Sequence, residues 1–370
     1  MDGAVSRGNL GYGGEAERHT ADSPAASVVM PTHGRRASLL RVLRALGRQD
    51  TPTGAFEVVV VCDGDMDGSA AACRALAPRL PYPLRVLEQP NSGPAAARNR
   101  GVGAACAPLI VFLDDDVEPD KGLIAAHLDA QEGQELCVTI GPLLPPPDAR
   151  LSAWGSYEER TLCRQYDAMI NGWWPPDFRQ FYTGNAALLK RHIEAAGGFD
   201  AAFRRAEDVE LALRLRDRGL HFVFLPHARG WHYVRRSFAS WLRVPTAYGA
   251  ADVAMARADR PQLLADVARD FRDNRSEAVR RLTLLCAGRP ALARPVGAAL
   301  GLLARVSSRA GPARLADASC SLIFNLRYYD GLTGSLGGRA AFLRLLHGQE
   351  PATVLAWRAP RGGRRRRRAS

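Results

Sequence analysis

The sequence has almost no lysine. Only Lys121 and Lys190 occur among the 50 basic residues, so arginine carries nearly all of the formal net charge of +12. Five arginines are consecutive, Arg364 to Arg368, in a tail that could meet nucleic acid or anionic lipid. No recognition motif and no interleaved aromatic residues accompany them, so we expect no specific nucleic-acid partner. We predict that residues 358–370 form an arginine-rich disordered tail.

Long apolar runs and paired cysteine motifs are also absent. No stretch approaches the roughly 20 apolar residues of a membrane-spanning helix, and the best one, Val296 to Val306, contains Arg305. Residues 1–24 are polar and glycine-rich, so we expect a disordered segment there and no signal peptide. The seven cysteines form no C-x-x-C pair, which argues against a zinc site or a disulfide framework and suits a reducing, cytoplasmic compartment.

The sequence does contain an apolar run that ends in three carboxylates. Leu109 to Leu113 are typical of a strand buried on both faces, and Asp114, Asp115 and Asp116 follow at once. Three adjacent like charges repel one another unless a cation neutralises them. A divalent ion that also holds a diphosphate fits, because Mg²⁺ takes one or two protein carboxylates plus phosphate oxygens. For an isolated triplet, a solvated acidic turn is the alternative.

Three earlier apolar runs alternate with helical patterns. The predicted strands are Ala26 to Met30, Phe56 to Cys62 and Leu84 to Leu87. The predicted helices are a basic amphipathic segment after Thr32, then Ser69 to Leu80 and Ala95 to Ala105. Asn91, Ser92 and Pro94 supply a capping residue and a first-turn proline for the last of these. The order predicts a doubly wound α/β sheet with right-handed crossovers.

Polar groups follow each predicted strand. They are Thr32, Asp63, the turn from Asn91 to Arg100, and the three aspartates. In a parallel sheet these ends share one edge and can form a single ligand crevice. A response-regulator fold also gathers aspartates at strand ends, but it is about a third of this length and leaves the remainder unexplained.

After Asp120 the pattern loosens. Val138 to Leu143 reads as an edge strand, and regularity returns at Phe181 to Leu189. A helix is expected from about Ala206 to Arg218, a strand at Phe222 to Leu225, and mostly helix after Ser240. We therefore divide the chain into an α/β domain at 25–240, whose two parts meet at residue 120, and a helical C-terminal region at 241–357.

With these elements in view, the chain resembles the family 2 glycosyltransferases, which have a GT-A nucleotide-sugar-binding fold. The matching segments, in order, are SVVMPTHGR, FEVVVVCDG, NSGPAAARNRGV, LIVFLDDDVEPD, FYTGNAALLKR, GGFDAAFRRAEDVELALRLRDRG and GWHY. They cover about Ser27 to Tyr233. Each segment is loose by itself, and their order and spacing carry the resemblance.

The resemblance implies a nucleotide-sugar site at the strand ends. Its members would be Pro31, Thr32, Arg36, Asp63, Asn91, Arg98, Asp114 and Asp115. Asp63 would accept a hydrogen bond from a base N–H, and Arg98 would lie near the base or the diphosphate. The usual second aspartate of the DDGS segment is absent, because Cys62 precedes Asp63. A turn residue is the alternative for Asp63, and a surface helix arginine for Arg98.

The same resemblance implies a metal and a catalytic base. Asp116 and Asp114, with His232 as a third ligand, would hold Mn²⁺ or Mg²⁺. Asp208 would be the base, and Glu207 would position it or the acceptor. Both carboxylates also stand where a helix dipole favours acidic residues, and His232 could be a packed loop residue.

An acceptor or sugar pocket is implied further along the chain. Thr183, Gly184 and Asn185 would line it, and Trp173 and Trp174 could stack on a sugar or a lipid acceptor, although tryptophans are more often core residues.

The implied reaction is metal-dependent transfer of a sugar, with inversion, from a UDP-, GDP- or dTDP-sugar to a hydroxyl acceptor. A nucleotidyltransferase is one alternative, although the segment after Thr32 lacks the glycine-rich, lysine-containing loop that such an enzyme usually shows. A non-catalytic protein that keeps the fold is another. The apolar stretches after Ser240 could dock on the inner face of a membrane, form a helical cap or make a homodimer contact, and these readings stay open.

Overall fold

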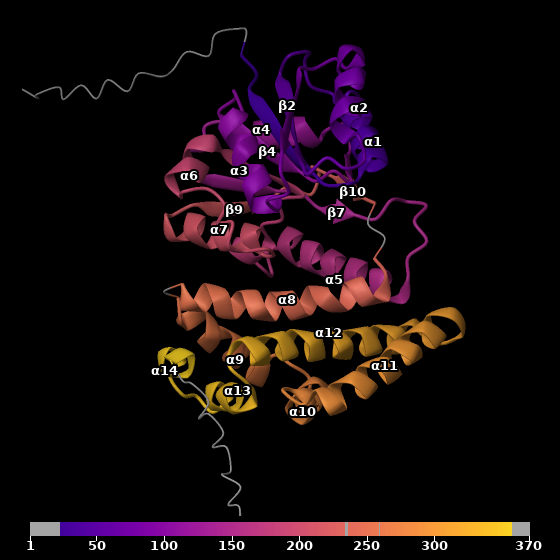
Figure 1. Ribbon diagram of the computed structural model, residues 1–370, viewed down its shortest axis with the longest axis vertical. Helices are drawn as coiled ribbons and strands as arrows, with labels where there is room; N and C mark the ends of the chain where they lie inside the picture. The colour runs from indigo at the N-terminus through magenta and orange to yellow at the C-terminus, as the bar shows by residue number, and fades with distance from the viewer. Residues whose placement is uncertain (1–22, 234–235, 259, 357–370) are drawn as a thin grey trace, which may run out of the picture.

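We describe the protein from a computed structural model, which covers residues 23–233, 236–258 and 260–356. Figure 1 shows two parts stacked along the long axis: a sheet part at the top and a helical part below it. The arginine tail and nearly all of the N-terminal segment, both predicted to be disordered, lie outside the described residues.

A seven-stranded sheet with the order β3-β2-β1-β4-β8-β6-β9 forms the centre of the sheet part. Its strands are β1 (Ala26–Thr32), β2 (Phe56–Asp63), β3 (Leu84–Gln89), β4 (Leu109–Leu113), β6 (Cys137–Ile140), β8 (Asn185–Leu189) and β9 (His221–Phe224). The first four run parallel, and β8 is antiparallel to both β4 and β6. The predicted doubly wound α/β architecture is confirmed, as a mixed sheet.

One predicted strand lies in a different place. The segment Val138 to Leu143 was expected at the edge of the sheet, but β6 pairs with β8 on one side and β9 on the other. All four residues of β6 are buried. Strand β9 closes the edge instead, because its run from His221 to Phe224 pairs in parallel register with β6.

Helices cover both faces of this sheet (Figure 1). They are α1 (Arg36–Leu46), α2 (Ser69–Leu76), α3 (Pro94–Ala104), α4 (Leu123–Gln131), α5 (Ala153–Ile170), α6 (Lys190–Ala195) and α7 (Glu207–Asp217), with short 3₁₀ turns at Ala77–Arg79 and Phe178–Gln180. Alternate residues of each strand face opposite sides. Val28 packs in a core with α1 and α4, whereas its neighbour Val29 packs in a core with α3 and α7.

The start of α3 differs from the capping expected of Asn91 and Ser92. The residue before the helix is Gly93, and no side chain caps it. Pro94 does occupy the first turn, as its missing N–H allows. The backbone N–H groups of Ser92 and Gly93 donate instead to the carboxylate of Asp63.

A second, three-stranded sheet lies beside the end of β4. It consists of β5 (Val117–Pro119), β10 (Gly230–His232) and β7 (Leu143–Leu144), in the order β5-β10-β7. Its antiparallel register pairs His232 with Val117. The histidine from late in the chain therefore lies next to the carboxylates that follow β4.

The helical part follows directly. It comprises α8 (Phe238–Arg257), α9 (Gln262–Asp273), α10 (Glu277–Cys286), α11 (Pro290–Ala310), α12 (Ala313–Ser335), α13 (Arg339–Leu346) and α14 (Pro351–Ala356). Among the described residues, no helix combines the length and the apolarity that crossing a bilayer requires. The predicted domain boundary at residue 240 falls within the first turn of α8, and the division into domains stays a prediction.

Helices α8 and α12 approach so closely that glycine is required on both. A Cβ at Gly249 of α8 would lie 2.0 Å from the carbonyl oxygen of Tyr328, and a Cβ at Gly331 of α12 would lie 2.0 Å from that of Thr246. Since both obstacles are backbone atoms, neither can move without shifting a helix. Gly334, one turn further along α12, has nothing within 4 Å of its Cβ position.

We predict opposite effects of alanine at these two glycines of α12. Gly331→Ala lowers the free energy of unfolding by about 2 kcal/mol, because overpacking forces the helices apart. Gly334→Ala raises it by up to about 1 kcal/mol, because alanine is the better helix former in open space. Urea denaturation of both variants measures this, and equal effects would contradict the close approach.

Candidate active site

The carboxyl ends of β1 and β4 lie next to each other because the two strands pair in parallel. The Thr32 hydroxyl, at the end of β1, donates a hydrogen bond of 2.7 Å to Oδ2 of Asp115. Asp115 is buried, and this burial raises the pKa of its carboxyl to about 6 against the opposing effects of Thr32 and Arg35. Asp115 therefore joins two strand ends.

Arg35 also lies at the carboxyl ends of these strands, which we call the carboxyl edge of the sheet. It was not identified from the sequence. Its guanidinium donates to Oδ1 of Asp115 at 3.1 Å and also to the carboxylate of Asp116. The sequence feature that could have identified Arg35 is its position three residues after Thr32, in the turn that follows β1. With half of its side chain exposed, Arg35 neutralises two of the three aspartates from the solvent side.

Asp116 and His232 form the part of the edge that fits a divalent ion. His232 Nε2 lies 3.5 Å from Oδ1 of Asp116, and the Tyr233 N–H donates to the Asp116 carbonyl oxygen at 2.8 Å. Although burial opposes it, His232 and Arg35 hold the pKa of Asp116 below its usual range. Within the described residues no group of three or more such side chains is arranged around one point. The donor set suits an ion shared with phosphate oxygens more than one enclosed by protein.

Asp63 holds the loop that begins α3. Its Oδ1 accepts from Gln89 Nε2 at 2.8 Å and from the Ser92 N–H at 2.7 Å, and its Oδ2 accepts from the Gly93 N–H at 2.8 Å. These bonds match the turn role that the sequence left open for Asp63. A contact with a nucleotide base stays a prediction.

Arg98 lies in the interior of the site. Its side chain is 6% exposed, with Nη2 donating to Asp114 Oδ1 at 2.9 Å and Nη1 to Glu207 Oε1 at 2.7 Å. The ring of Phe199 lies against it, 5.8 Å from the guanidinium carbon. The arginine therefore joins the end of β4 to the start of α7, and it is no surface helix arginine.

Asp208 lies one residue beyond Glu207, in the first turn of α7. The residue before the helix, Ala206, has φ of 58°, the only positive φ at a non-glycine among the described residues. Such a conformation costs energy and is typical of functional sites. Burial and the negative charge of Glu207 raise the pKa of Asp208 to about 7, and the charge of Arg98 opposes them. A carboxyl of that pKa can accept a proton near neutral pH.

Two tyrosines near Asp208 were not found from the sequence. Burial raises the pKa of Tyr182, and so does the charge of Asp208. The pKa of Tyr248, on α8, rises for the same two reasons, although its side chain remains partly accessible. Tyr182 lies in the segment FYTGNAALLKR, but its nearness to Asp208 depends on how distant elements pack, and no quoted segment contains Tyr248.

The predicted pocket residues lie in different surroundings. Gly184 stands close to Asp114, because a Cβ there would be 3.2 Å from Asp114 Oδ2, and Thr183 beside it is buried. Asn185 corrects the prediction. It is fully buried, its Nδ2 donates to the carbonyl oxygens of Pro142 and Ala228, and its Oδ1 bonds to His127. Its side chain joins β8 to α4 and to the turns that contain Pro142 and Ala228, and it does not line a pocket.

The remaining predicted residues lie nearer the surface. Trp173 and Trp174 follow α5, with 79% and 45% of their surface exposed, so neither is a core residue. Arg36 and Asn91 are also exposed, and Pro31 is partly buried at the end of β1. The Arg36 N–H donates to Asp67.

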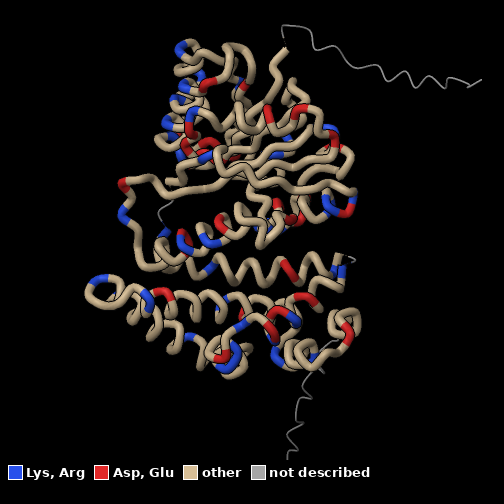
Figure 2. The backbone as a smooth tube through the Cα atoms, turned by 180° about the vertical axis from the view of Figure 1, so that it is seen from behind, with Lys and Arg blue, Asp and Glu red and all other residues tan. Residues whose placement is uncertain are grey.

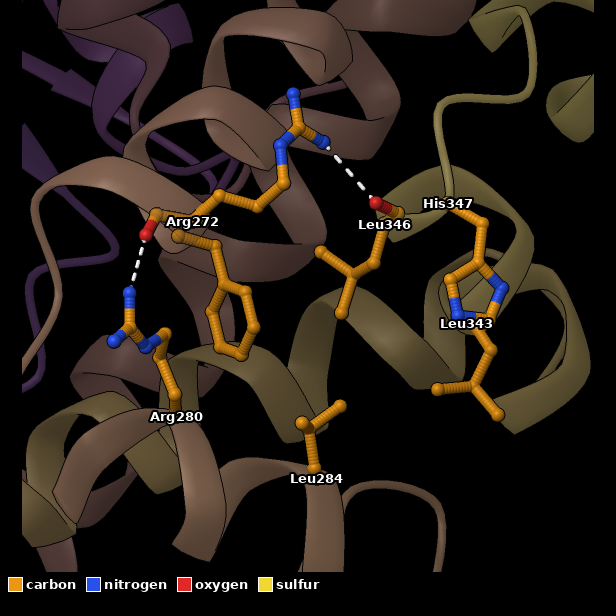
Figure 3. Close-up of a pocket in the computed structure, with 7 residues that line it drawn as sticks. Arg272, Arg280, Leu284, Leu343, Leu346 and His347 are labelled. Carbon is orange, nitrogen blue, oxygen red and sulfur yellow. Dashed lines mark hydrogen bonds between the residues drawn. The ribbon is translucent and has the colours of Figure 1, made fainter. Parts of the chain in front are cut away.

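A pocket of about 300 Å³ lies elsewhere, in the helical part (Figure 3). Arg272 donates to the carbonyl oxygen of Leu346 at 3.1 Å, and Arg280 donates to that of Arg272. Phe271 and Leu284 line the same pocket. Since the guanidinium groups bond to the backbone and no residue of the carboxyl edge takes part, this pocket is separate from the candidate active site.

A parallel half-sheet with a D-x-D pair at its edge is the architecture of GT-A glycosyltransferases, and solved structures agree. The chain resembles the mannosyltransferase PcManGT from Pyrobaculum calidifontis, solved with GDP-Man and Mn²⁺, with a TM-score of 0.56, 18% identity, and 83% of this chain and 87% of that one covered. It also resembles TarS 1-349 of S. aureus in complex with UDP-GlcNAc, with a TM-score of 0.53, 18% identity, and 82% and 90% covered. At these identities the likeness establishes the fold.

The sequence comparison points to a family. Residues 27–205, just under half of the chain, match Glycosyl transferase family 2, which supports a family 2 glycosyltransferase domain in this part of the chain. It is 31% identical over 229 residues to a validoxylamine A glucosyltransferase of Streptomyces hygroscopicus subsp. jinggangensis, covering 54% of this chain and 53% of that protein. It is 29% identical over 255 residues to the pre-mycofactocin glycosyltransferase of Mycobacterium tuberculosis, covering 63% and 48%. The chain thus spans about half the length of these relatives.

The raised pKa of Asp208 predicts a pH-dependent gain in stability for Asp208→Asn. In the unfolded chain the carboxyl titrates near 3.9, so between about pH 4 and 7 the folded state keeps a proton that the unfolded state has lost. Wild-type stability therefore falls over that range, relative to a group that does not ionise. The variant should equal wild type near pH 4 and exceed it by up to about 4 kcal/mol at pH 8, because a shift of about three pKa units corresponds to that free energy. Urea titrations at both pH values measure this, and a gap independent of pH would contradict it.

Proposed function

We propose that this protein transfers a sugar from a nucleotide-diphosphate sugar to a hydroxyl acceptor, with inversion at the anomeric carbon. The observation that carries the proposal is the Arg98 link. It ties Asp114, beside the Asp116–His232 pair, to Glu207, beside the carboxyl of raised pKa. Arg98 thereby connects the proposed ion site at Asp116 and His232, through Asp114, with the proposed base Asp208, through Glu207.

The donor side of the proposal uses the ends of the parallel strands. Thr32, Asp63 and the Asn91 loop would take the nucleoside, in agreement with the crevice position typical of open α/β sheets. The nucleoside could be uridine, guanosine or deoxythymidine. GDP-Man and UDP-GlcNAc are bound by the two structural neighbours, so the base stays open.

Asp116 and His232 would hold the divalent ion, Mn²⁺ or Mg²⁺, together with phosphate oxygens. When bound, the ion supplies positive charge beside the diphosphate leaving group. Arg35, which contacts Asp115 and Asp116, is a permanently charged group with several donors that suit phosphate oxygens.

Asp208 would act on the acceptor. Its carboxylate takes the proton of the acceptor hydroxyl as the oxygen attacks the anomeric carbon, and a single displacement of that kind inverts the centre. Glu207 bonds to Arg98, which holds the Glu207 side chain in place next to Asp208. Trp173 and Trp174 are exposed aromatic rings, and we propose them, with Thr183 and Gly184, as acceptor or sugar contacts.

The proposal extends to the compartment. All seven cysteines are free, five of them buried, which suits reducing surroundings such as the cytoplasm.

Asp116→Asn tests the ion site. The variant should lose roughly 10²–10³-fold in transfer, since the charge opposite the leaving group is no longer held. It should also abolish the rise in thermal transition that Mn²⁺ adds to a nucleoside diphosphate, which a screen of nucleoside diphosphates and nucleotide sugars measures in wild type. Asp120→Asn, four residues on and past β5, is the matched control. An unchanged response to Mn²⁺ in Asp116→Asn would refute the site.

Asp208→Asn tests the base. We expect kcat to fall by about 10²–10⁴-fold while donor affinity stays the same. In wild type the rate should decline as pH falls below about 7, because Asp208 becomes protonated. Asp217→Asn, at the other end of α7, should leave both unchanged.

The products of the same assay separate the reaction classes. A nucleoside diphosphate is expected, and free pyrophosphate would indicate a nucleotidyltransferase. Near-full turnover by Asp208→Asn would show that Asp208 is not the base.

A further inference from the structure

Helix α11 carries its large apolar side chains on the outside. Against the rest of the protein it buries small residues, Ala293, Gly297, Gly301, Ala304 and Ser307. The Gly301 position has room for no side chain, because a Cβ there would lie 2.6 Å from the ring of Phe238. This inverts the usual arrangement, in which an amphipathic helix turns its large apolar residues toward the core.

The exposed apolar residues share one side of the helix. Leu292, Leu302, Leu303 and Val306 recur at helical spacing, and we call them the α11 outer face. Leu302 is 62% exposed and Val306 is 55% exposed. From residue 292 to 306 the face extends for roughly 21 Å along the axis, at 1.5 Å per residue. A continuous apolar stripe of this kind marks an interaction surface.

The charge on α11 itself has one sign. Residues 278–316 contain no aspartate or glutamate but seven arginines, at positions 280, 281, 289, 294, 305, 309 and 314, of which Arg280 and Arg281 pair with Glu277 at the start of α10. On α11 itself Arg294, Arg305 and Arg309 are exposed, and by helical spacing they lie along one flank of the outer face. Figure 2 shows the turn from α11 to α12 at one corner of the molecule, with Lys and Arg positions in blue.

We propose that the α11 outer face docks on a lipid bilayer rich in anionic headgroups. The leucines and valine enter the boundary between headgroups and acyl chains, while the arginines on the flank reach the phosphates. Each arginine near such a surface adds attraction, because the potential of an anionic leaflet is negative. The chemistry recognised is therefore an acidic phospholipid surface.

The charge pattern favours lipid over a second copy of the chain. Two copies joined through this face would bring their rows of arginines together, with no carboxylate in 278–316 to pair with them. An anionic bilayer neutralises the same arginines. The position in the fold also suits docking, because α11 packs against α12 and against α5 through its small residues, while its outer face stays exposed (Figure 1). Docking there leaves the carboxyl edge of the sheet uncovered.

Vesicle sedimentation of the full chain tests the proposal. Wild type should sediment with vesicles that contain phosphatidylglycerol, bind vesicles of pure phosphatidylcholine at least about fivefold more weakly, and lose binding as salt rises. Leu302→Glu should weaken binding to the phosphatidylglycerol vesicles by about tenfold, because it places a carboxylate in the apolar stripe. Since Leu302 is exposed, the thermal transition of the Leu302→Glu variant should match that of wild type.

The matched control is Leu136→Glu, which makes the same change at another exposed leucine, in the sheet part. It alters the net charge equally and should bind like wild type. Arg309→Gln should weaken binding about fivefold and lower the salt dependence.

Three results would overturn the proposal. Wild type could fail to bind at low salt. Equal losses in Leu302→Glu and Leu136→Glu would show that net charge alone, including the arginine tail, accounts for binding. Light scattering could find a wild-type dimer that Leu302→Glu converts to a monomer while vesicle binding is unchanged, which would assign the face to a second copy.

Discussion

The site depends on one buried cation, the guanidinium of Arg98. A charge of this kind is costly to remove from water, and it is tolerated only where its partners are fixed in good geometry. Asp114 and Glu207 provide those partners from two elements that are distant in the chain, the end of β4 and the start of α7. The arginine thereby fixes the catalytic helix relative to the sheet. Its contribution is to geometry more than to stability, because a buried ion pair returns little more than its desolvation cost.

The same cation sets the electrostatics of its neighbour. Burial and Glu207 both push the Asp208 carboxyl toward its neutral form, and Arg98 alone among the main causes of the shift is a charge that opposes them. The balance places the pKa of Asp208 near neutrality, where a carboxyl is basic enough to take a proton and still largely ionised at slightly alkaline pH. The left-handed backbone at Ala206 and the burial of Glu207 beside Asp208 are costs that a purely structural helix start would not carry.

The features of the fold and the site that depend on local sequence patterns could be predicted, whereas those that depend on contacts between distant segments could not. The apolar runs before Thr32, Asp63 and Asp114 identified three strands of the parallel half-sheet, because a strand buried on both faces needs only a local pattern. The partners of Arg98 could not be predicted in that way, since each depends on where a distant element packs. Arg35 was overlooked although it stands in the first strand's own turn. Asn185 was misjudged because an asparagine that bonds to a buried histidine and to turn carbonyls cannot be told in a sequence from one that lines a pocket.

The pairing of β4 with β8 has a consequence for how such a chain can change. Leu113 lies opposite Asn185 in the antiparallel ladder, so the chain leaves the catalytic edge and returns to it at the same point. Strand β8 also pairs with β6, so the part of the chain between β6 and β8, which includes α5 and the two exposed tryptophans, leaves the sheet and returns to it with both ends anchored. Lengthening an anchored loop costs little free energy. The surface turns of this part of the chain can therefore be replaced while the pairing register of β4 with β8 is preserved.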